Sequence, residues 1–419
     1  MAVATGLAVL VGAVLVGVLR LLPEGSYSFD VHSWLGVAGL LRQGRNPYNE
    51  TNLLNWPPLW MQLLYLFDQV SQLIHLRLLR VIQLFLVVVD ALVAAVAYLM
   101  LRRHWNVRRS WLLITVGIAL NPVAIILIDV HGNFDVVVAL LVTLFLWAIT
   151  GWRRHGRPED WLLACLCVGV GGLTKTVPFV LAPLLLTGWR RLNMRLGVLG
   201  SALLLGPVVV GVSVIYVFGP QQVTAHVLDY RSIPGTFGMT GLTRALNLPV
   251  SDHTYTRAFE VLMLAVVAMV VVRAVRRGLS ERELILLTAL LLMLPPILGP
   301  GYAPQYAWWW LPTLVMAYAL EGFWLRVPLL VLFVVASVTY AVDYALVPTL
   351  GGGVLVPGHP SWAAASRVLA SSLSAETYLR LPLFAAYLVV LLAAAVQLAR
   401  RRPAPLVDAV RGAPEAAAR

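Results

Sequence analysis

Apolar stretches suited to crossing a bilayer recur along this chain from its first residues to its last. About 20 apolar residues cross the hydrocarbon core as an α-helix. Such stretches lie near residues 3–22, 80–101, 111–129, 136–150, 161–173, 177–187, 195–218, 258–273, 283–298, 306–321, 327–346 and 381–399. Hydrophobic residues make up 60% of the chain and charged residues 12%. The sequence therefore predicts an all-α polytopic membrane protein with about 12 transmembrane helices.

The basic residues form short clusters between these stretches and indicate the orientation. One set of alternate segments carries Arg102, Arg103, Arg108, Arg109, Arg153, Arg154, Arg157, Arg190, Arg191, Arg195, Arg273, Arg276, Arg277, Arg282, Arg326, Arg400, Arg401, Arg402, Arg411 and Arg419. Positive charge is retained on the cytoplasmic side of membrane proteins, so we expect both termini in the cytoplasm. The formal net charge of +12 therefore indicates topology and not a nucleic-acid partner.

We expect a single transmembrane domain over residues 1–402 and a disordered cytoplasmic tail at 403–419, where Pro, Ala and Arg dominate. The first apolar stretch lacks a basic n-region, so we interpret it as an uncleaved helix. The long segments between spans are all outer ones, at about 23–79, 219–257 and 347–380. Any chemistry is therefore expected on the extracytoplasmic face.

The first outer segment opens with "SYSFDVHSW", which places Asp30 and His32 directly after the first apolar stretch. The run "WLGVAGLLRQG" then has apolar residues at helical spacing and predicts an amphipathic helix on the membrane surface. In "NWPPLW", Pro57 and Pro58 stop any helix and Trp56 supplies a ring suited to the headgroup layer. A second surface helix or re-entrant segment is expected after them.

Two further segments point to the same face. "LIDVHGNFDVVVALL" carries Asp129, His131, Asn133 and Asp135 in a turn between two spans. "GGLTKTVPF" contains Lys175, the only lysine in the chain, between two short apolar half-spans. An ionisable group at membrane depth is costly and usually functional, and a compact ammonium suits a phosphate group.

The order of "YSFDVHSW", "NPYNETNLLNWPPLW", "IDVHGNFD" and "GPGYAPQYAWWWLP" resembles the landmarks of the GT-C superfamily, the integral-membrane glycosyltransferases that use polyprenyl-phosphate-linked sugars. The last of these is similar to an element of bacterial mannosyltransferase-type members. The resemblance covers most of residues 1–320. Glucose-dependent relatives commonly have an acid before a "YPP" element, where this chain has Asn55 and Trp56, so the sugar stays open.

The resemblance implies an inverting transfer of a hexose, with mannose as the first expectation, from a polyprenyl-phosphate donor to an extracytoplasmic acceptor glycan or glycolipid. Asp30 would be the general base, and its place beside the hydrocarbon boundary is expected to raise its pKa. A fixed cation would stabilise the leaving phosphate. Lys175 is the first candidate, followed by Arg231, Arg244 and His253.

The remaining candidates are those expected to contact the sugar or the acceptor: His32, Trp56, Asp129, His131, Asn133, Asp135, Gln305 and Tyr306. A metal is not required, because one or two cations offset the charge of a monophosphate donor. If Mg²⁺ or Mn²⁺ binds, Asp30, Asp129 and Asp135 are the expected oxygen ligands.

Several of the candidate residues also have a simpler, structural interpretation. Asp30 could cap the surface helix, Lys175 could extend to the lipid headgroups, and Trp308–Trp310 could form an interfacial aromatic belt. A lipid-carrier flippase or transporter, or a lipid-linked glycan polymerase or ligase, is the alternative function. The high Ala, Arg and Gly content favours a GC-rich bacterial genome, and hence the bacterial plasma membrane.

Overall fold

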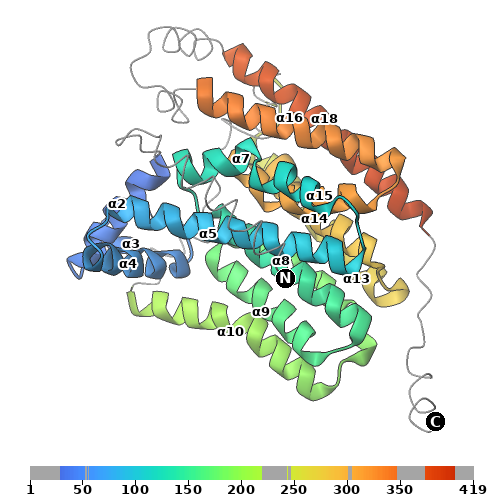
Figure 1. Ribbon diagram of the computed structural model, residues 1–419, viewed down its shortest axis with the longest axis horizontal. Helices are drawn as coiled ribbons and strands as arrows, with labels where there is room; N and C mark the ends of the chain where they lie inside the picture. Colours follow the sequence, from blue (N-terminus) through green and yellow to red (C-terminus); the bar gives the residue numbers. More distant parts are fainter. Residues whose placement is uncertain are drawn as a thin grey trace.

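The computed structural model describes residues 29–51, 54, 56–218, 243, 247–300, 304–346 and 373–401. All regular secondary structure in these ranges is helical, which confirms the predicted all-α class. Figure 1 shows long helices packed side by side, with the short helices α2, α3 and α4 gathered at one end. The predicted span at 3–22 and the tail at 403–419 lie outside the described residues.

Most predicted spans within the described ranges coincide with a long helix. These helices are α5 (Leu78–Leu99), α8 (Asp135–His155), α9 (Pro158–Thr174), α10 (Met194–Phe218), α13 (Asp252–Arg277), α14 (Glu281–Leu298), α16 (Phe323–Leu346) and α18 (Leu373–Arg400). Of the described helices, 6 are long and apolar enough to cross a membrane, or up to 7 if a bent pair counts as one span. The protein is therefore an integral membrane protein.

Two predicted spans are not continuous α-helices. The stretch at 177–187 forms the 3-10 helix η4 (Val177–Leu186), which contains Pro183. The stretch at 306–321 divides into the 3-10 helix η7 (Pro304–Trp309) and the 10-residue α15 (Leu311–Leu320). Ten α-helical residues cover about 15 Å, half of the hydrocarbon core. For these two stretches the prediction of a simple spanning helix is wrong.

The predicted span at 111–129 is broken near its middle. Its two halves, Ser110–Ala119 and Pro122–Ile128, meet at 43°. At the break the side chain of Asn121 accepts a hydrogen bond of 2.8 Å from the backbone N–H of Val123, and Pro122 starts the second half. The chain continues as the π-helical segment η3 (Ile126–His131), which ends at Gly132.

Both helices expected in the first outer segment are present. The first is α2 (Phe29–Arg42), which ends shortly before Gly44, a residue with a φ of 69°. After the short α3 (Pro47–Glu50), the second is α4 (Pro58–Leu73), with Pro58 in its first turn. Arg42 forms an ion pair with the buried Asp68 of α4, which holds the two helices together.

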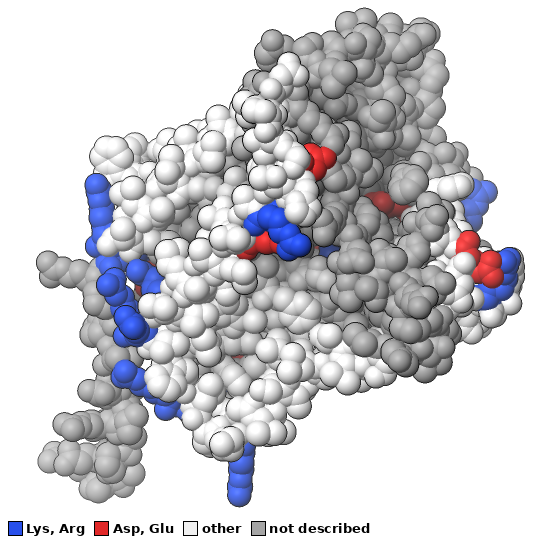
Figure 2. All heavy atoms as spheres, turned by 180° about the vertical axis from the view of Figure 1, so that it is seen from behind, with Lys and Arg blue, Asp and Glu red and all other residues white. Residues whose placement is uncertain are grey.

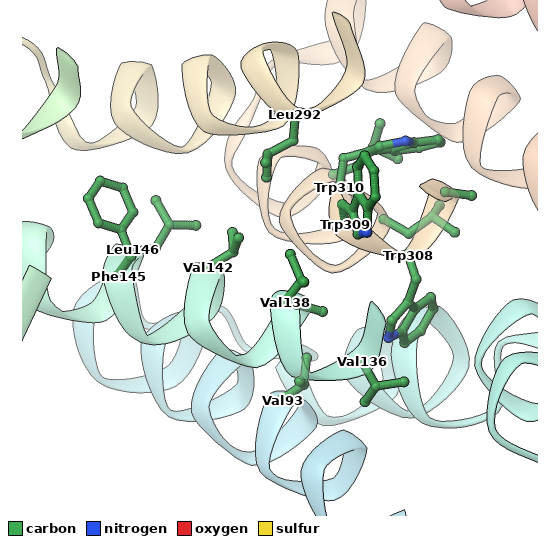
Figure 3. Close-up of a cluster of buried hydrophobic side chains, with 14 of the residues drawn as sticks. Val93, Val136, Val138, Val142, Phe145, Leu146, Leu292, Trp308, Trp309 and Trp310 are labelled. Atoms are coloured by element: carbon green, nitrogen blue, oxygen red, sulfur yellow. The ribbon is translucent and has the colours of Figure 1, made fainter. Parts of the chain in front are cut away.

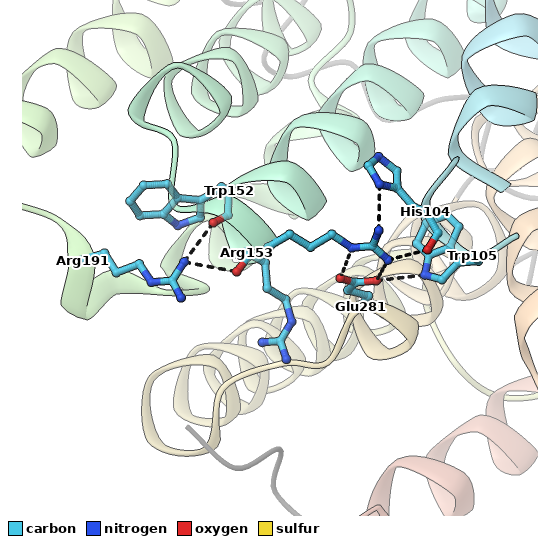
Figure 4. Close-up of polar contacts among 7 residues, drawn as sticks. His104, Trp105, Trp152, Arg153, Arg191 and Glu281 are labelled. Atoms are coloured by element: carbon cyan, nitrogen blue, oxygen red, sulfur yellow. Dashed lines mark hydrogen bonds and ion pairs between the residues drawn. The ribbon is translucent and has the colours of Figure 1, made fainter. Parts of the chain in front are cut away.

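Basic side chains gather at the end of the molecule opposite to α2–α4, and they form a row along one edge in Figure 2. Figure 4 shows a network at this end that joins α8 to α14. Arg154 Nε lies 2.5 Å from Glu281 Oε1, and Trp105 Nε1 donates to Glu281 Oε2 at 2.9 Å. Burial disfavours the charged form of Glu281, but the hydrogen bonds and charge of Arg154 outweigh it, so its pKa lies below its ordinary value.

The tryptophans at 308–310 are part of the core. Trp308, Trp309 and Trp310 are at most 2% exposed, and Figure 3 shows them in one apolar cluster with Val136 and Val138 of α8 and Leu292 of α14. The prediction of an interfacial belt is wrong for these residues. Their segment is held inward because η7 and α15 pack against α8 and α14.

Candidate active site

Asp30 lies in the first turn of α2, since this helix already includes Phe29. The capping interpretation would place Asp30 before the helix, and it does not fit. The side chain is partly buried, and its Oδ2 accepts a hydrogen bond of 2.7 Å from Nδ2 of Asn133. The structure therefore brings together two predicted site residues that are 103 positions apart.

The turn after η3 presents Asn133 in a fixed orientation. Gly132 has a φ of 63°, and a Cβ atom there would lie 2.9 Å from Cγ2 of Val31 in α2, so only glycine fits. The backbone N–H of Asn133 donates to the carbonyl of Leu127 at 2.8 Å. Its side-chain Oδ1 accepts from the backbone N–H of Asp135 at 2.9 Å. Both Nδ2 and Oδ1 of the Asn133 side chain thus form hydrogen bonds.

Asp135 and Lys175 form an ion pair next to this turn. Lys175 Nζ lies 2.6 Å from Asp135 Oδ1, and the two side chains are 20% and 0% exposed. Asp135 starts α8, and Lys175 follows the last residue of α9 in an extended conformation. A buried carboxylate is costly unless it is paired, so Lys175 neutralises Asp135 and Asp135 fixes the position of the ammonium.

Three aromatic rings surround the Lys175 ammonium. Nζ lies 4.6 Å from the ring centroid of Tyr306, 4.8 Å from that of Trp309 and 5.3 Å from that of Phe134. Tyr306 and Trp309 are stacked with centroids 4.2 Å apart. This stacking follows from the 3-10 conformation of η7, in which residues i and i+3 eclipse. The rings favour a cation at this position.

An aromatic cluster beneath the site joins α2, α4 and the turn. Trp60 stacks on Phe134 with centroids 4.7 Å apart, and Trp34 meets Trp60 edge-on at 5.0 Å. Trp56 contacts both Trp34 and Phe134 at 6.4 Å and is 6% exposed. The "WPP" element therefore supports the turn that carries Asn133 and Asp135.

The other predicted site residues are placed as follows. His32 and His253 are exposed, on α2 and in the first turn of α13, while Gln305 is partly exposed next to Tyr306. The backbone of Asp129 and His131 belongs to η3, but their side chains are not among those described. Arg231 and Arg244 lie outside the described residues. Among the described side chains, no group of three or more His, Cys, Asp or Glu is arranged to hold a metal ion.

Sequence reasoning missed Phe134 and Trp309 as neighbours of the lysine. Phe134 was visible only as part of the "HGNFD" turn, and Trp309 was assigned to an interfacial belt. The available signal was the spacing of Tyr306 and Trp309, which places the two rings together only if the segment is a 3-10 helix.

The candidate site and the basic network lie at opposite ends of α8. Asp135 is its first residue, and Arg154 of the basic network lies near its last residue, His155. Its 21 residues cover about 30 Å, the thickness of a hydrocarbon core. The fold and the site thus define a helical membrane protein that holds linked carboxylate and ammonium groups at one end of its spans.

The chain belongs to glycosyltransferase family 87, whose family model matches residues 56–295. The protein is therefore a membrane glycosyltransferase, and the predicted class of enzyme is confirmed. The matched region includes Asn133, Asp135 and Lys175, whereas Asp30 and η7 lie outside it. A search of curated proteins finds no match.

Among solved structures, the chain is similar to ArnT from Cupriavidus metallidurans, whose structure was determined with undecaprenyl phosphate bound. The sequence identity is 14%, and the alignment covers 93% of this chain and 77% of that one with a TM-score of 0.49.

Proposed function

We propose that this glycosyltransferase moves a hexose, mannose in the first instance, from a polyprenyl-phosphate carrier to an acceptor glycan or glycolipid on the extracytoplasmic face of the bacterial plasma membrane. The observation that carries the proposal is the hydrogen-bonded path from Asp30 through Asn133 and Asp135 to Lys175. It links a candidate base to a candidate phosphate-binding cation at one end of the membrane spans.

Asp30 is the proposed general base. Its carboxylate is partly exposed and is held by Asn133, so an acceptor hydroxyl can approach a base of fixed position. Asp30 takes the hydroxyl proton while the acceptor oxygen forms a bond to the anomeric carbon. Attack from the side opposite to the phosphate inverts the configuration.

Lys175 is the proposed partner of the leaving group. As the bond from the anomeric carbon to the phosphate oxygen breaks, its electron pair stays on that oxygen, and the phosphate monoanion of the donor becomes a dianion. A lysine ammonium has three N–H donors, of which Asp135 takes one. A cation fixed before the reaction gains strength as this charge develops and so contributes to rate. This role does not require a metal, although Mg²⁺ or Mn²⁺ remains compatible with it.

The place of the site favours a lipid-linked donor. The Lys175 side chain is 20% exposed and lies about 30 Å along α8 from the basic network around Arg154. Positive charge marks the cytoplasmic end, so the site belongs to the opposite surface. A phosphate at headgroup level can reach Lys175 while its polyprenyl chain stays in the bilayer.

The test is sugar transfer by purified protein in liposomes supplied with polyprenyl-phosphate mannose or glucose and a mixed glycolipid acceptor extract. The proposal expects transfer from the mannose donor, and Asp30→Asn should abolish transfer while donor binding is retained. Glu50→Gln is a matched control, because Glu50 is a partly exposed carboxylate of the same outer segment that pairs with Arg45.

Equal transfer by wild type and Asp30→Asn would remove Asp30 from the chemistry. Transfer from the glucose donor alone would overturn the assignment of mannose. Movement of the carrier across the bilayer without any transfer would favour the flippase alternative for this site.

A further inference from the structure

An apolar cavity of about 270 Å³ lies between the segment formed by α6 (Ser110–Ile114) and η2 (Thr115–Ala119), α15 and α16. Its lining is almost entirely aliphatic and aromatic, and includes Leu112 and Val116 from the first element, Leu314 and Tyr318 from the second, and Leu330 and Phe333 from the third. The residues of the proposed transferase site are not among those that line it. The cavity is therefore a separate feature of the protein.

The cavity opens on the side of the helices. Leu112, Val116 and Leu330 line it and are 41%, 55% and 45% exposed. In a membrane-spanning protein, exposed aliphatic side chains on a helix flank face lipid. An acyl chain can thus enter the cavity laterally from the bilayer.

The cavity lies near the cytoplasmic surface. Arg109 directly precedes α6 (Ser110–Ile114), and the lining residues Leu112 and Val116 follow it by three and seven positions. In α16, Leu330 and Phe333 follow Arg326 by four and seven positions. Seven helical residues correspond to about 10 Å, so the cavity is at the depth of the inner-leaflet acyl chains.

A separate contact indicates on which side of the membrane the cavity lies. The segment before α6 contains His104, whose carbonyl accepts a hydrogen bond from Arg154 at 2.8 Å. Arg154 is near the end of α8 opposite to Asp135. The cavity and the Lys175 site therefore lie at opposite ends of the spans.

The rim of the cavity is positively charged. Arg326 is exposed, donates through Nε to the carbonyl of Tyr318 at 3.1 Å, and lies 5.8 Å from the ring of that lining residue. Arg108 and Arg109 are also exposed, just before the first lining helix. The nearby Glu321 is 2% exposed and lies 2.5 Å from Arg401, so it does not offset this charge.

We propose that this cavity binds an anionic phospholipid of the inner leaflet. One acyl chain fills the space between α6–η2, α15 and α16, and the headgroup phosphate is bound by Arg326, with Arg108 and Arg109 beside it. The apolar lining of the cavity suits an acyl chain, and the guanidinium groups at its rim suit an anionic headgroup. The proposal does not depend on the sugar, the donor or the acceptor of the transferase.

The test is photocrosslinking of the purified full-length protein in nanodiscs. The probe is phosphatidylglycerol with a diazirine in one acyl chain, compared with phosphatidylcholine that carries the same chains. The proposal expects preferential labelling by phosphatidylglycerol within 110–117 and 314–333. Leu330→Trp should fill the cavity and remove this labelling, whereas Val331→Trp, at an exposed neighbouring position outside the lining, should retain it.

The charge is tested separately. Arg326→Gln should weaken labelling by phosphatidylglycerol about fivefold, the effect of one basic residue near an anionic surface. Labelling by phosphatidylcholine should fall less, because its choline cation offsets the charge of its phosphate. Arg282→Gln, which changes an exposed arginine in the first turn of α14, is the control and should have no effect.

Three results would overturn the proposal. Equal labelling by the two lipids would remove the anionic specificity, and labelling that survives Leu330→Trp would place the chain elsewhere. Displacement of phosphatidylglycerol by equimolar undecaprenyl phosphate would make a carrier lipid the occupant. The Arg326→Gln comparison keeps the test decisive if Leu330→Trp does not fold.

Discussion

Removal of either partner of the Asp135–Lys175 ion pair should destabilise the protein, and the two removals should differ in size. Lys175→Met leaves a carboxylate that is 0% exposed without its cation. Loss of one partner of a buried pair costs about 3–5 kcal/mol. Asp135→Asn instead leaves an ammonium that is 20% exposed and lies near three rings, so the expected cost is lower, about 1–3 kcal/mol.

The double variant distinguishes this reasoning from simple loss of packing. With both charges removed, no buried charge is left uncompensated, so Asp135→Asn with Lys175→Met should be more stable than Lys175→Met alone. The assay is thermal unfolding in detergent followed by tryptophan fluorescence at one scan rate, which ranks the variants even if unfolding is irreversible.

The exposed pair of Arg257 and Glu260 provides the control for this cycle. Its side chains are 66% and 44% exposed, so Glu260→Gln should cost less than about 1 kcal/mol. Destabilisation by Asp135→Asn and Lys175→Met that simply adds in the double variant would refute the argument that the two buried charges are coupled.

Three further predictions follow from the site and the basic end. Asn133→Asp places a second carboxylate beside Asp30, so the acidic limb of the pH profile of kcat/KM should move up by about one unit or more, and an unchanged profile would contradict the role of Asp30 as base. Gly132→Ala should cost about 1–2 kcal/mol from its positive φ plus a steric clash with α2, and should lower transfer more than Gly44→Ala, where φ is 69° but no atom lies within 4 Å. Glu281 has a lowered folded-state pKa, so its contribution to stability is present above its ordinary value of 4.5 and is lost as pH falls through the folded value. Glu281→Gln should therefore reduce the loss of stability that thermal unfolding measures as the pH is lowered below this ordinary value.

Local sequence determined the class of protein and the candidate base and cation. The recurrence of apolar stretches limits the chain to spanning helices, because backbone groups in lipid must pair within their own segment. Asp30 after the first stretch and Lys175 between two half-spans stood out because ionisable residues are rare at such positions. These inferences needed no knowledge of which helices are neighbours.

The tertiary structure alone decided how these residues work together. Asn133 meets Asp30 across 103 positions and Asp135 meets Lys175 across 40, and contacts at such separations depend on how α2, α8 and α9 pack. Packing of their segment against α8 and α14 buried the tryptophans at 308–310, against the expectation from composition. A sequence pattern specifies the preference of each segment, whereas partners, burial and side-chain distances are set by the neighbouring segments that pack against it.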